Sequence, residues 1–249
     1  MTRVCRCICA LAVMTVALTV LVALRPVPAE AAVALRPVWA HRGGTGHGYV
    51  ENTRANYRAA AREGSLRWET DVRFTGTGHP VLLHDSHLDV FRCPDVRISR
   101  VSVPRARQCS ASNGQSITTL SEFAKDVQAY RARAWIELKT RPTRAQWRSL
   151  QASIRPIRTR IVVQSFLPPA VVAATARGYT TARLSSRALR PRDLPGGTDW
   201  YAPQFEHVTG AQATAMHRAG LKVAAWTPSS SRWRSIPAAV DQLISNDIP

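Results

Sequence analysis

The chain has 249 residues, of which 45% are hydrophobic and 7% aromatic, enough for one α/β barrel or two small domains with a substantial core. Its formal net charge is +18, but the excess is nearly all arginine scattered along the sequence. No basic tract is interleaved with aromatic residues, so a dedicated nucleic-acid site is not expected. Electrostatic contact with an anionic envelope or membrane surface stays open.

Residues 1–31 have the pattern of a secretory signal peptide. Arg3 and Arg6 precede an apolar run over residues 8–24, and a segment of small residues ends at Ala31. We expect a secreted protein with cleavage near Ala31. An uncleaved membrane anchor is the alternative, because the apolar run is nearly long enough to span a bilayer.

From residue 32 onward, short apolar segments alternate with segments of helical period. The predicted strands are 38–42, 67–74, 81–84, 135–139, 161–165, 181–184, 200–203 and 223–227, and the predicted helices are 52–63, 120–130, 169–177 and 209–218. Eight strands with intervening crossovers indicate an α/β fold, a (β/α)8 TIM barrel, as a single domain over residues 32–249. The stretch between the third strand and residue 120 has poor periodicity, so we expect an irregular insertion after the third strand.

Two cysteines, Cys93 and Cys109, remain in this insertion once the leader is set aside. In an exported chain a disulfide between them would stabilise the fold by roughly 3 kcal/mol, because it restricts the unfolded chain. Two free thiols are the alternative. Zinc binding by the pair is disfavoured, since no Cys-x-x-Cys or nearby histidine spacing accompanies it.

Charged and imidazole side chains fall at the ends of the first four predicted strands. In chain order they are His41 and Arg42, Glu69 and Asp71, His84 and Asp85, and Glu137 and Lys139. The C-terminal strand ends of a (β/α)8 barrel converge on one face, and residues two apart on a strand share a side. Burial of so many charges without a ligand would be unfavourable, so the pattern indicates an active site.

The same residues belong to motifs that follow one another along most of the chain. These motifs are AHRGG at 40–44, ENT at 51–53, WETDV at 68–72, PVLLHD at 80–85, ITTLSE at 117–122, WIELK at 135–139, QSF at 164–166, AWT at 225–227 and ISNDIP at 244–249. In order and spacing the set resembles the glycerophosphodiester phosphodiesterase family. The resemblance implies a metal-dependent phosphodiesterase that hydrolyses glycerophosphodiesters to an alcohol and glycerol 3-phosphate.

The resemblance also implies one divalent cation, Mg²⁺ or Ca²⁺. Glu69, Asp71 and Glu137 would hold it, because ligand sets made only of oxygen suit hard ions. Glu51 would be a further ligand or would orient one.

The remaining implied roles concern the phosphate and the alcohol. His41 and His84 would be the general acid/base pair, since imidazole titrates near neutral pH. Arg42 and Lys139 would bind the non-bridging phosphate oxygens. Trp226 would pack against the alcohol moiety, with core packing as the alternative.

Two other functions stay open. One is a phospholipase-D-like enzyme that acts on lysophospholipid or sphingolipid headgroups. The other is a non-catalytic module that binds an anionic envelope polymer through its arginines. Departures from the family pattern, such as Val50 where a proline usually precedes Glu51, lie on the alcohol side of the site. The expected substrate is therefore a small phosphodiester or lysolipid, with the alcohol and the oligomeric state left open.

Overall fold

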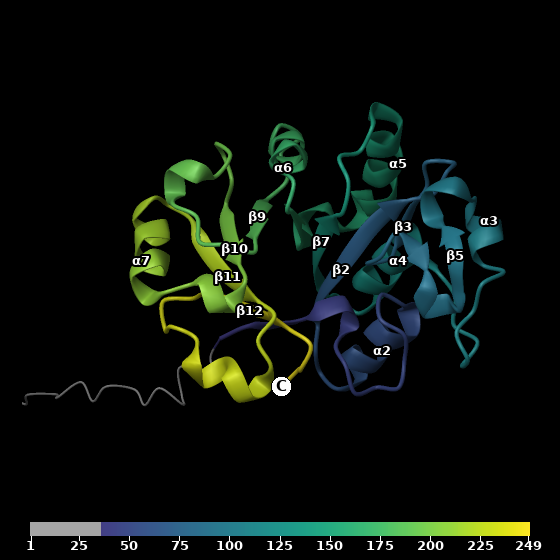
Figure 1. Ribbon diagram of the computed structural model, residues 1–249, viewed down its shortest axis with the longest axis horizontal. Coiled ribbons are helices and arrows are strands. Elements are labelled where there is room, and N and C mark those ends of the chain that lie inside the picture. Colours follow the sequence, from purple (N-terminus) through teal and green to yellow (C-terminus); the bar gives the residue numbers. More distant parts are fainter. Residues whose placement is uncertain (1–35) are drawn as a thin grey trace, which may run out of the picture.

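A computed structural model describes residues 36–249, so the leader expected over residues 1–31 lies outside the described residues. Eight parallel strands form a closed barrel in which β1 pairs with both β2 and β12 (Figure 1). In chain order the barrel strands are β1 (Val38–Ala40), β2 (Arg67–Phe74), β7 (Arg133–Leu138), β8 (Ile161–Ser165), β9 (Thr181–Ser185), β10 (Trp200–Pro203), β11 (Lys222–Trp226) and β12 (Gln242–Ser245). This architecture confirms the predicted TIM barrel.

Helices occupy five of the connections between barrel strands. They are α2 (Arg54–Arg62), α4 (Leu120–Ala129), α5 (Arg144–Ile154), α6 (Pro168–Thr175) and α7 (Gly210–Arg218). Four of them begin at a threonine whose side chain accepts a hydrogen bond from a backbone N–H of the first turn. Such caps satisfy donors that have no partner within the helix. Helix α5 is absent from the sequence-based prediction, whereas the other four match predicted helices.

The predicted third strand is not a barrel strand. It corresponds to β3 (Pro80–Leu82), which pairs antiparallel with the end of β2. Only residues 75–79 connect the two strands, and a parallel crossover needs a dozen or more residues. The barrel position assigned to it is therefore wrong, and β12 completes the set of eight.

The expected insertion does follow this third strand. It contains β4 (His87–Leu88), β5 (Cys93–Arg97), α3 (Val103–Ala106) and β6 (Thr118–Thr119). Its buried apolar residues, among them Leu88, Phe91 and Ile98, form a small core of their own. Cys93 and Cys109 form the predicted disulfide, with their Cα atoms 5.9 Å apart.

The interior of the barrel has an apolar layer below a polar one. Trp135 packs against Trp39 and Trp200, with ring centroids 5.7 and 5.3 Å apart. In the register of β2 and β7, Glu69 lies opposite Trp135 and Asp71 lies opposite Glu137, one step nearer the strand ends. Asp71 and Glu137 therefore sit above the level of Trp135, toward the face where barrel enzymes carry their sites, and Glu69 lies at the boundary of the two layers.

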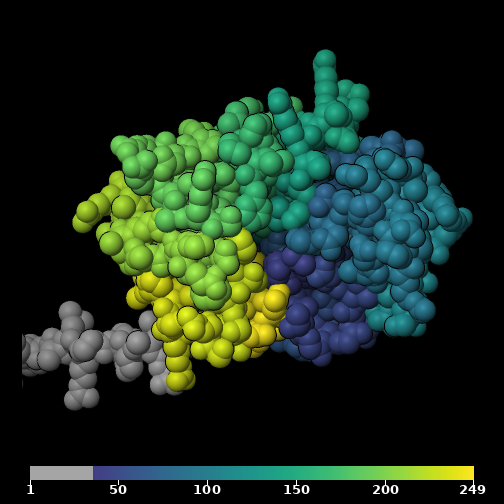
Figure 2. All heavy atoms as spheres, viewed as in Figure 1, coloured from purple at the N-terminus to yellow at the C-terminus, as the bar shows by residue number. Residues whose placement is uncertain are grey.

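Closure of the barrel brings the two ends of the described chain together. The backbone N–H of Thr45, in the loop after β1, donates to the carbonyl of Asn246 after β12. In Figure 2 the purple N-terminal residues accordingly lie beside the yellow C-terminal ones. Within residues 36–249, no helix combines the length and hydropathy needed to cross a membrane.

Candidate active site

Three buried carboxylates meet at the C-terminal ends of β2 and β7. Glu69, Asp71 and Glu137 each offer an oxygen, and these oxygens all lie within 4.8 Å of one another. The side-chain alternation of β2 and its parallel pairing with β7 account for the cluster. The structure thus brings together the three acids that the sequence assigned to a metal.

The carboxylates perturb one another because they are buried together. Burial, followed by repulsion from Asp71 and Glu137, raises the pKa of Glu69 well above its usual range. Burial and then Asp71 raise the pKa of Glu137 to about 7. Burial also acts to raise the pKa of Asp71, but the nearby Lys139 and Arg42 outweigh it and the pKa is lowered. Without a further positive charge, the site therefore disfavours the ionised forms of Glu69 and Glu137.

The donor set fits a hard divalent cation. It consists of carboxylate oxygens, which Mg²⁺ and Ca²⁺ both accept. Gln164 Oε1, a buried amide oxygen of the same cavity, has no hydrogen-bond partner, and an unsatisfied buried acceptor is unfavourable unless a ligand approaches it.

Two cations lie beside the carboxylates. Lys139 Nζ is 3.0 Å from Glu137 Oε1 and 3.4 Å from Asp71 Oδ1. Arg42 Nε is 3.1 Å from Asp71 Oδ2, and Arg42 NH1 is 2.9 Å from Glu51 Oε2. Glu51 thus lies outside the cluster of three acids and forms an ion pair with Arg42.

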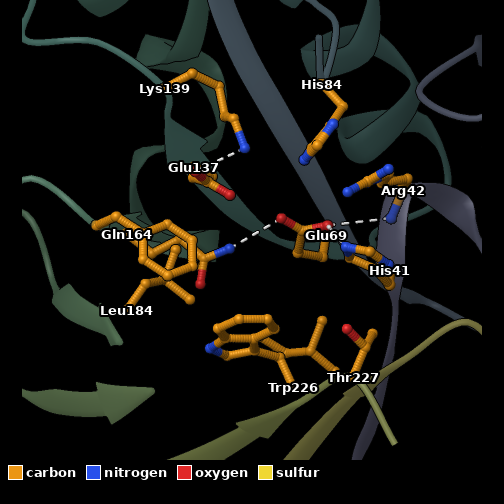
Figure 3. Close-up of a pocket in the computed structure, with 12 residues that line it drawn as sticks. His41, Arg42, Glu69, His84, Glu137, Lys139, Gln164, Leu184, Trp226 and Thr227 are labelled. Atoms are coloured by element: carbon orange, nitrogen blue, oxygen red, sulfur yellow. Dashed lines mark hydrogen bonds and ion pairs between the residues drawn. The ribbon is translucent and has the colours of Figure 1, made fainter. Parts of the chain in front are cut away.

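Both predicted histidines line the same cavity of about 230 Å³ and point toward Glu69 (Figure 3). His41 Nδ1 lies 2.6 Å from Asn246 Oδ1, and its Nε2 lies 3.9 Å from Glu69 Oε2. Burial, followed by the charge of Arg42, lowers the pKa of His41 to about 4. His84 Nδ1 lies 2.9 Å from Asp85 Oδ1. Each imidazole is therefore held through Nδ1.

The opposite side of the cavity is apolar. Trp226 and Phe166 pack edge to face there, with ring centroids 5.3 Å apart, and Leu184 and Ile244 line the cavity beside them. Trp226 Nε1 donates to the carbonyl of Ala202 at 2.9 Å, which fixes the indole against the wall (Figure 3). The site thus has a charged half and an apolar half.

Three amide side chains complete the charged half, and the sequence analysis assigned no role to any of them. Gln164 Nε2 donates to Glu69 Oε1 at 2.9 Å, and Asn52 Nδ2 donates to Asp71 Oδ2 at 2.9 Å. Asn246 holds His41, as described above. Gln164 follows three apolar residues of strand β8, and this interruption of the apolar run could have indicated a functional role. The two asparagines lie in loops, where no periodic pattern could have indicated them.

Comparison with known proteins relates this geometry to a family. The sequence model described as the glycerophosphoryl diester phosphodiesterase family matches residues 41–248. The chain is 44% identical over 75 residues to glycerophosphodiester phosphodiesterase 1 of Bos taurus, a match covering 28% of this chain and 22% of that protein. It is 29% identical over 221 residues to "Probable glycerophosphodiester phosphodiesterase 2" of Mycobacterium tuberculosis, covering 77% of this chain and 79% of that protein.

A solved structure shows the same fold. A phosphodiesterase from Oleispira antarctica, in complex with the product sn-glycerol-3-phosphate, superposes with a TM-score of 0.70 at 22% identity, covering 86% of this chain and 95% of that one. The curated mammalian relative is matched over only about a fifth of its length, whereas the family match extends from the first histidine almost to the last residue. This chain belongs to the glycerophosphoryl diester phosphodiesterase family.

Proposed function

We propose that this protein is a divalent-metal-dependent phosphodiesterase that hydrolyses glycerophosphodiesters to an alcohol and glycerol 3-phosphate. The observation that carries the proposal is the buried cluster of Glu69, Asp71 and Glu137, whose oxygens lie within 4.8 Å of one another in a cavity lined by two histidines. Family membership supports it, since members of the family depend on a divalent metal. Mg²⁺ or Ca²⁺ would neutralise charge on the phosphate oxygens when bound.

The cations of the site would bind the substrate phosphate. Arg42 presents a guanidinium fork and Lys139 an ammonium group, and both line the cavity. Both are already compensated by carboxylates, so a phosphodiester would enter a site with little net positive charge unless a metal ion balances the acids. Substrate affinity should therefore depend on the metal.

Hydrogen bonds at Nδ1 distinguish the two histidines. Asn246 Oδ1 can only accept, so Nδ1 of His41 carries the proton and Nε2 presents a free lone pair to the cavity. His41 is thus suited to accept a proton as the base. Asp85 holds the ring of His84 through Nδ1, and His84 lines the cavity, so we assign to it the transfer of a proton to the leaving alcohol.

The apolar half of the cavity would contact the alcohol. Trp226 and Phe166 offer aromatic surface in the same cavity as the charged residues. The same wall would accept a short alcohol or the first carbons of a longer one.

The experiment is hydrolysis of sn-glycero-3-phosphocholine, followed through release of glycerol 3-phosphate. We expect activity that EDTA abolishes and added Mg²⁺ or Ca²⁺ restores, and a loss of about a hundredfold or more for His41→Ala and for His84→Ala. His207→Ala, at an exposed histidine away from the cavity, is the matched control and should retain activity.

Other outcomes would contradict the proposal. Activity that survives both the chelator and the histidine substitutions would exclude this site. Release of choline from a lysophospholipid at a higher rate than from glycerophosphocholine would favour the phospholipase-D-like reaction. A folded but inactive wild type that binds polyanions would favour a non-catalytic module.

We also propose that the protein is secreted, with the leader cleaved near Ala31. The apolar run and the small residues that follow support this, and the disulfide between Cys93 and Cys109 is typical of an oxidising compartment. N-terminal sequencing of the protein from culture medium tests it. Recovery of the intact N-terminus in membranes would indicate an anchor instead.

A further inference from the structure

A second cavity, of about 240 Å³, adjoins the proposed active site. Three arginines line it, Arg73, Arg97 and Arg141, together with hydroxyl and amide side chains and the apolar Phe74 and Ile98. Within the described part of the chain, no carboxylate belongs to this lining. An arginine-rich wall without acids is the chemistry of an anion site.

Two short segments of the chain contribute residues to both cavities, with His84 and Lys139 in the lining of the first and Ser86 and Arg141 in the lining of the second. Arg73 donates from Nε and NH2 to the carbonyl of His84, at 2.8 and 2.7 Å, and His84 itself lines the active-site cavity. Arg141 follows Lys139 by two residues, where α5 and β3 approach the end of β2 (Figure 1). Arg73 also lies two residues beyond Asp71 on β2, so it occupies the same side of the strand, nearer its end. The second cavity therefore lies beside the mouth of the first.

The charges of this cavity are poorly compensated. Arg97 and Arg141 are exposed and form no ion pair with any residue of the part of the chain that the structure describes. Burial lowers the pKa of Arg73 and the charge of Arg97 acts in the same direction, although nearby carboxylates oppose them. An anion in this cavity would compensate the charges of Arg97 and Arg141, for which the lining offers no carboxylate.

We propose that the arginine cavity binds a second phosphate group of the substrate, so that a diester carrying two phosphates is preferred over one carrying a single phosphate. The proposal rests on the proposed hydrolase function, because it extends the same site by one subsite. Guanidinium forks match phosphate oxygens, and the position beside His84 and Lys139 suits a neighbouring unit of an oligomeric substrate. A free phosphate ion has the same chemistry, so the test must separate the two sources.

The experiment compares kcat/KM for glycerophosphoglycerol and for its homologue with two glycerol phosphate units. We expect the wild type to prefer the two-phosphate substrate by about three- to tenfold at low salt, with the preference falling as salt screens the contacts. Arg97→Gln combined with Arg141→Gln should abolish the preference and leave kcat/KM for the one-phosphate substrate unchanged. Arg73 is left intact, because it holds the backbone of His84.

The matched control is Arg62→Gln combined with Arg218→Gln. These exposed arginines lie in the last turns of α2 and α7, at the opposite end of the barrel, and their substitution removes the same charge. The control should keep the preference. An equal loss in both double variants would show that overall charge, and no local subsite, causes the preference.

Two further outcomes decide the proposal. A wild type that hydrolyses both substrates equally well would overturn the subsite and leave the proposed hydrolase intact, whereas failure to hydrolyse either would refute the hydrolase itself. Inhibition by inorganic phosphate is compared between the wild type and the variant that lacks Arg97 and Arg141. If phosphate inhibits the wild type more strongly while the wild type shows no substrate preference, the cavity binds a free anion and the assignment to substrate is wrong.

Discussion

Glu137→Gln removes one of the three buried carboxylates while keeping the size of the side chain. In the wild type, burial and then Asp71 raise the pKa of Glu137 from 4.5 to about 7, even though Lys139 lies 3.0 Å away. The folded protein therefore binds this proton more tightly than the unfolded chain does. The stability that this gives is fully present below about pH 4.5 and is lost as the pH rises through about 7.

The size of the effect follows from the pKa. A tenfold change in proton affinity corresponds to about 1.4 kcal/mol, so an ionised Glu137 destabilises the metal-free fold by about 3 kcal/mol above pH 7. Glutamine cannot ionise, and its amide oxygen can still accept a hydrogen bond from Lys139. In EDTA we expect E137Q to be more stable than the wild type by about 3 kcal/mol at alkaline pH, or about 6–12 °C in Tm. The two proteins should differ little at about pH 4.5.

Thermal unfolding is followed by circular dichroism, first in EDTA and then with Mg²⁺ or Ca²⁺. It measures the stability of the metal-free protein and the stabilisation that metal binding adds. Metal should stabilise the wild type by about 3 kcal/mol at a hundredfold excess over Kd, and E137Q much less. Glu206→Gln, at an exposed carboxylate, is the control and should change neither quantity. An E137Q protein no more stable than the wild type at alkaline pH in EDTA would refute the electrostatic argument. Equal stabilisation by metal would refute the role of Glu137 as a ligand.

Variants at three other sites test the interactions made there. Asn246→Ala removes the acceptor 2.6 Å from His41 Nδ1, so kcat should fall about tenfold with KM little changed, and Asn246→Asp, which also accepts, should restore part of the rate. Burial acts to raise the pKa of Asp126, but hydrogen bonds from Arg54 and Arg58 outweigh it and lower the pKa. Asp126→Asn should therefore lower the free energy of unfolding, measured in urea, by about 1–2 kcal/mol above pH 4. The difference from the wild type should vanish on acidification. Replacement of both Cys93 and Cys109 by serine should lower the free energy of unfolding by about 3 kcal/mol, and a reductant should do the same to the wild type.

The alternation of side chains along strands made the acidic cluster predictable. Glu69 and Asp71 interrupt an apolar strand at a spacing of two, and Glu137 does the same on β7, which β2 pairs with in parallel. The antiparallel pairing of residues 81–84 with β2 was not predictable from their composition, because an apolar segment does not reveal whether it pairs parallel or antiparallel with its neighbour. The short connection over residues 75–79 decides it, since it allows a hairpin and excludes a crossover.

The seam of the barrel explains why the partner of the proposed base could not be inferred from the sequence. Ala40 on β1 is in register with Ser245 on β12, so the next residue of each strand, His41 and Asn246, emerge side by side at the mouth. The sequence of either segment alone does not reveal this register. It depends on closure of the barrel between two strands that are neighbours in space but lie at opposite ends of the sequence of the domain. A neutral amide in a loop also carries no periodic signal, unlike an acid within an apolar strand. The tautomer of the proposed base is thus set by the strand pairing that closes the fold, and any change that shifts this pairing should impair proton transfer before it disturbs the acidic cluster between β2 and β7.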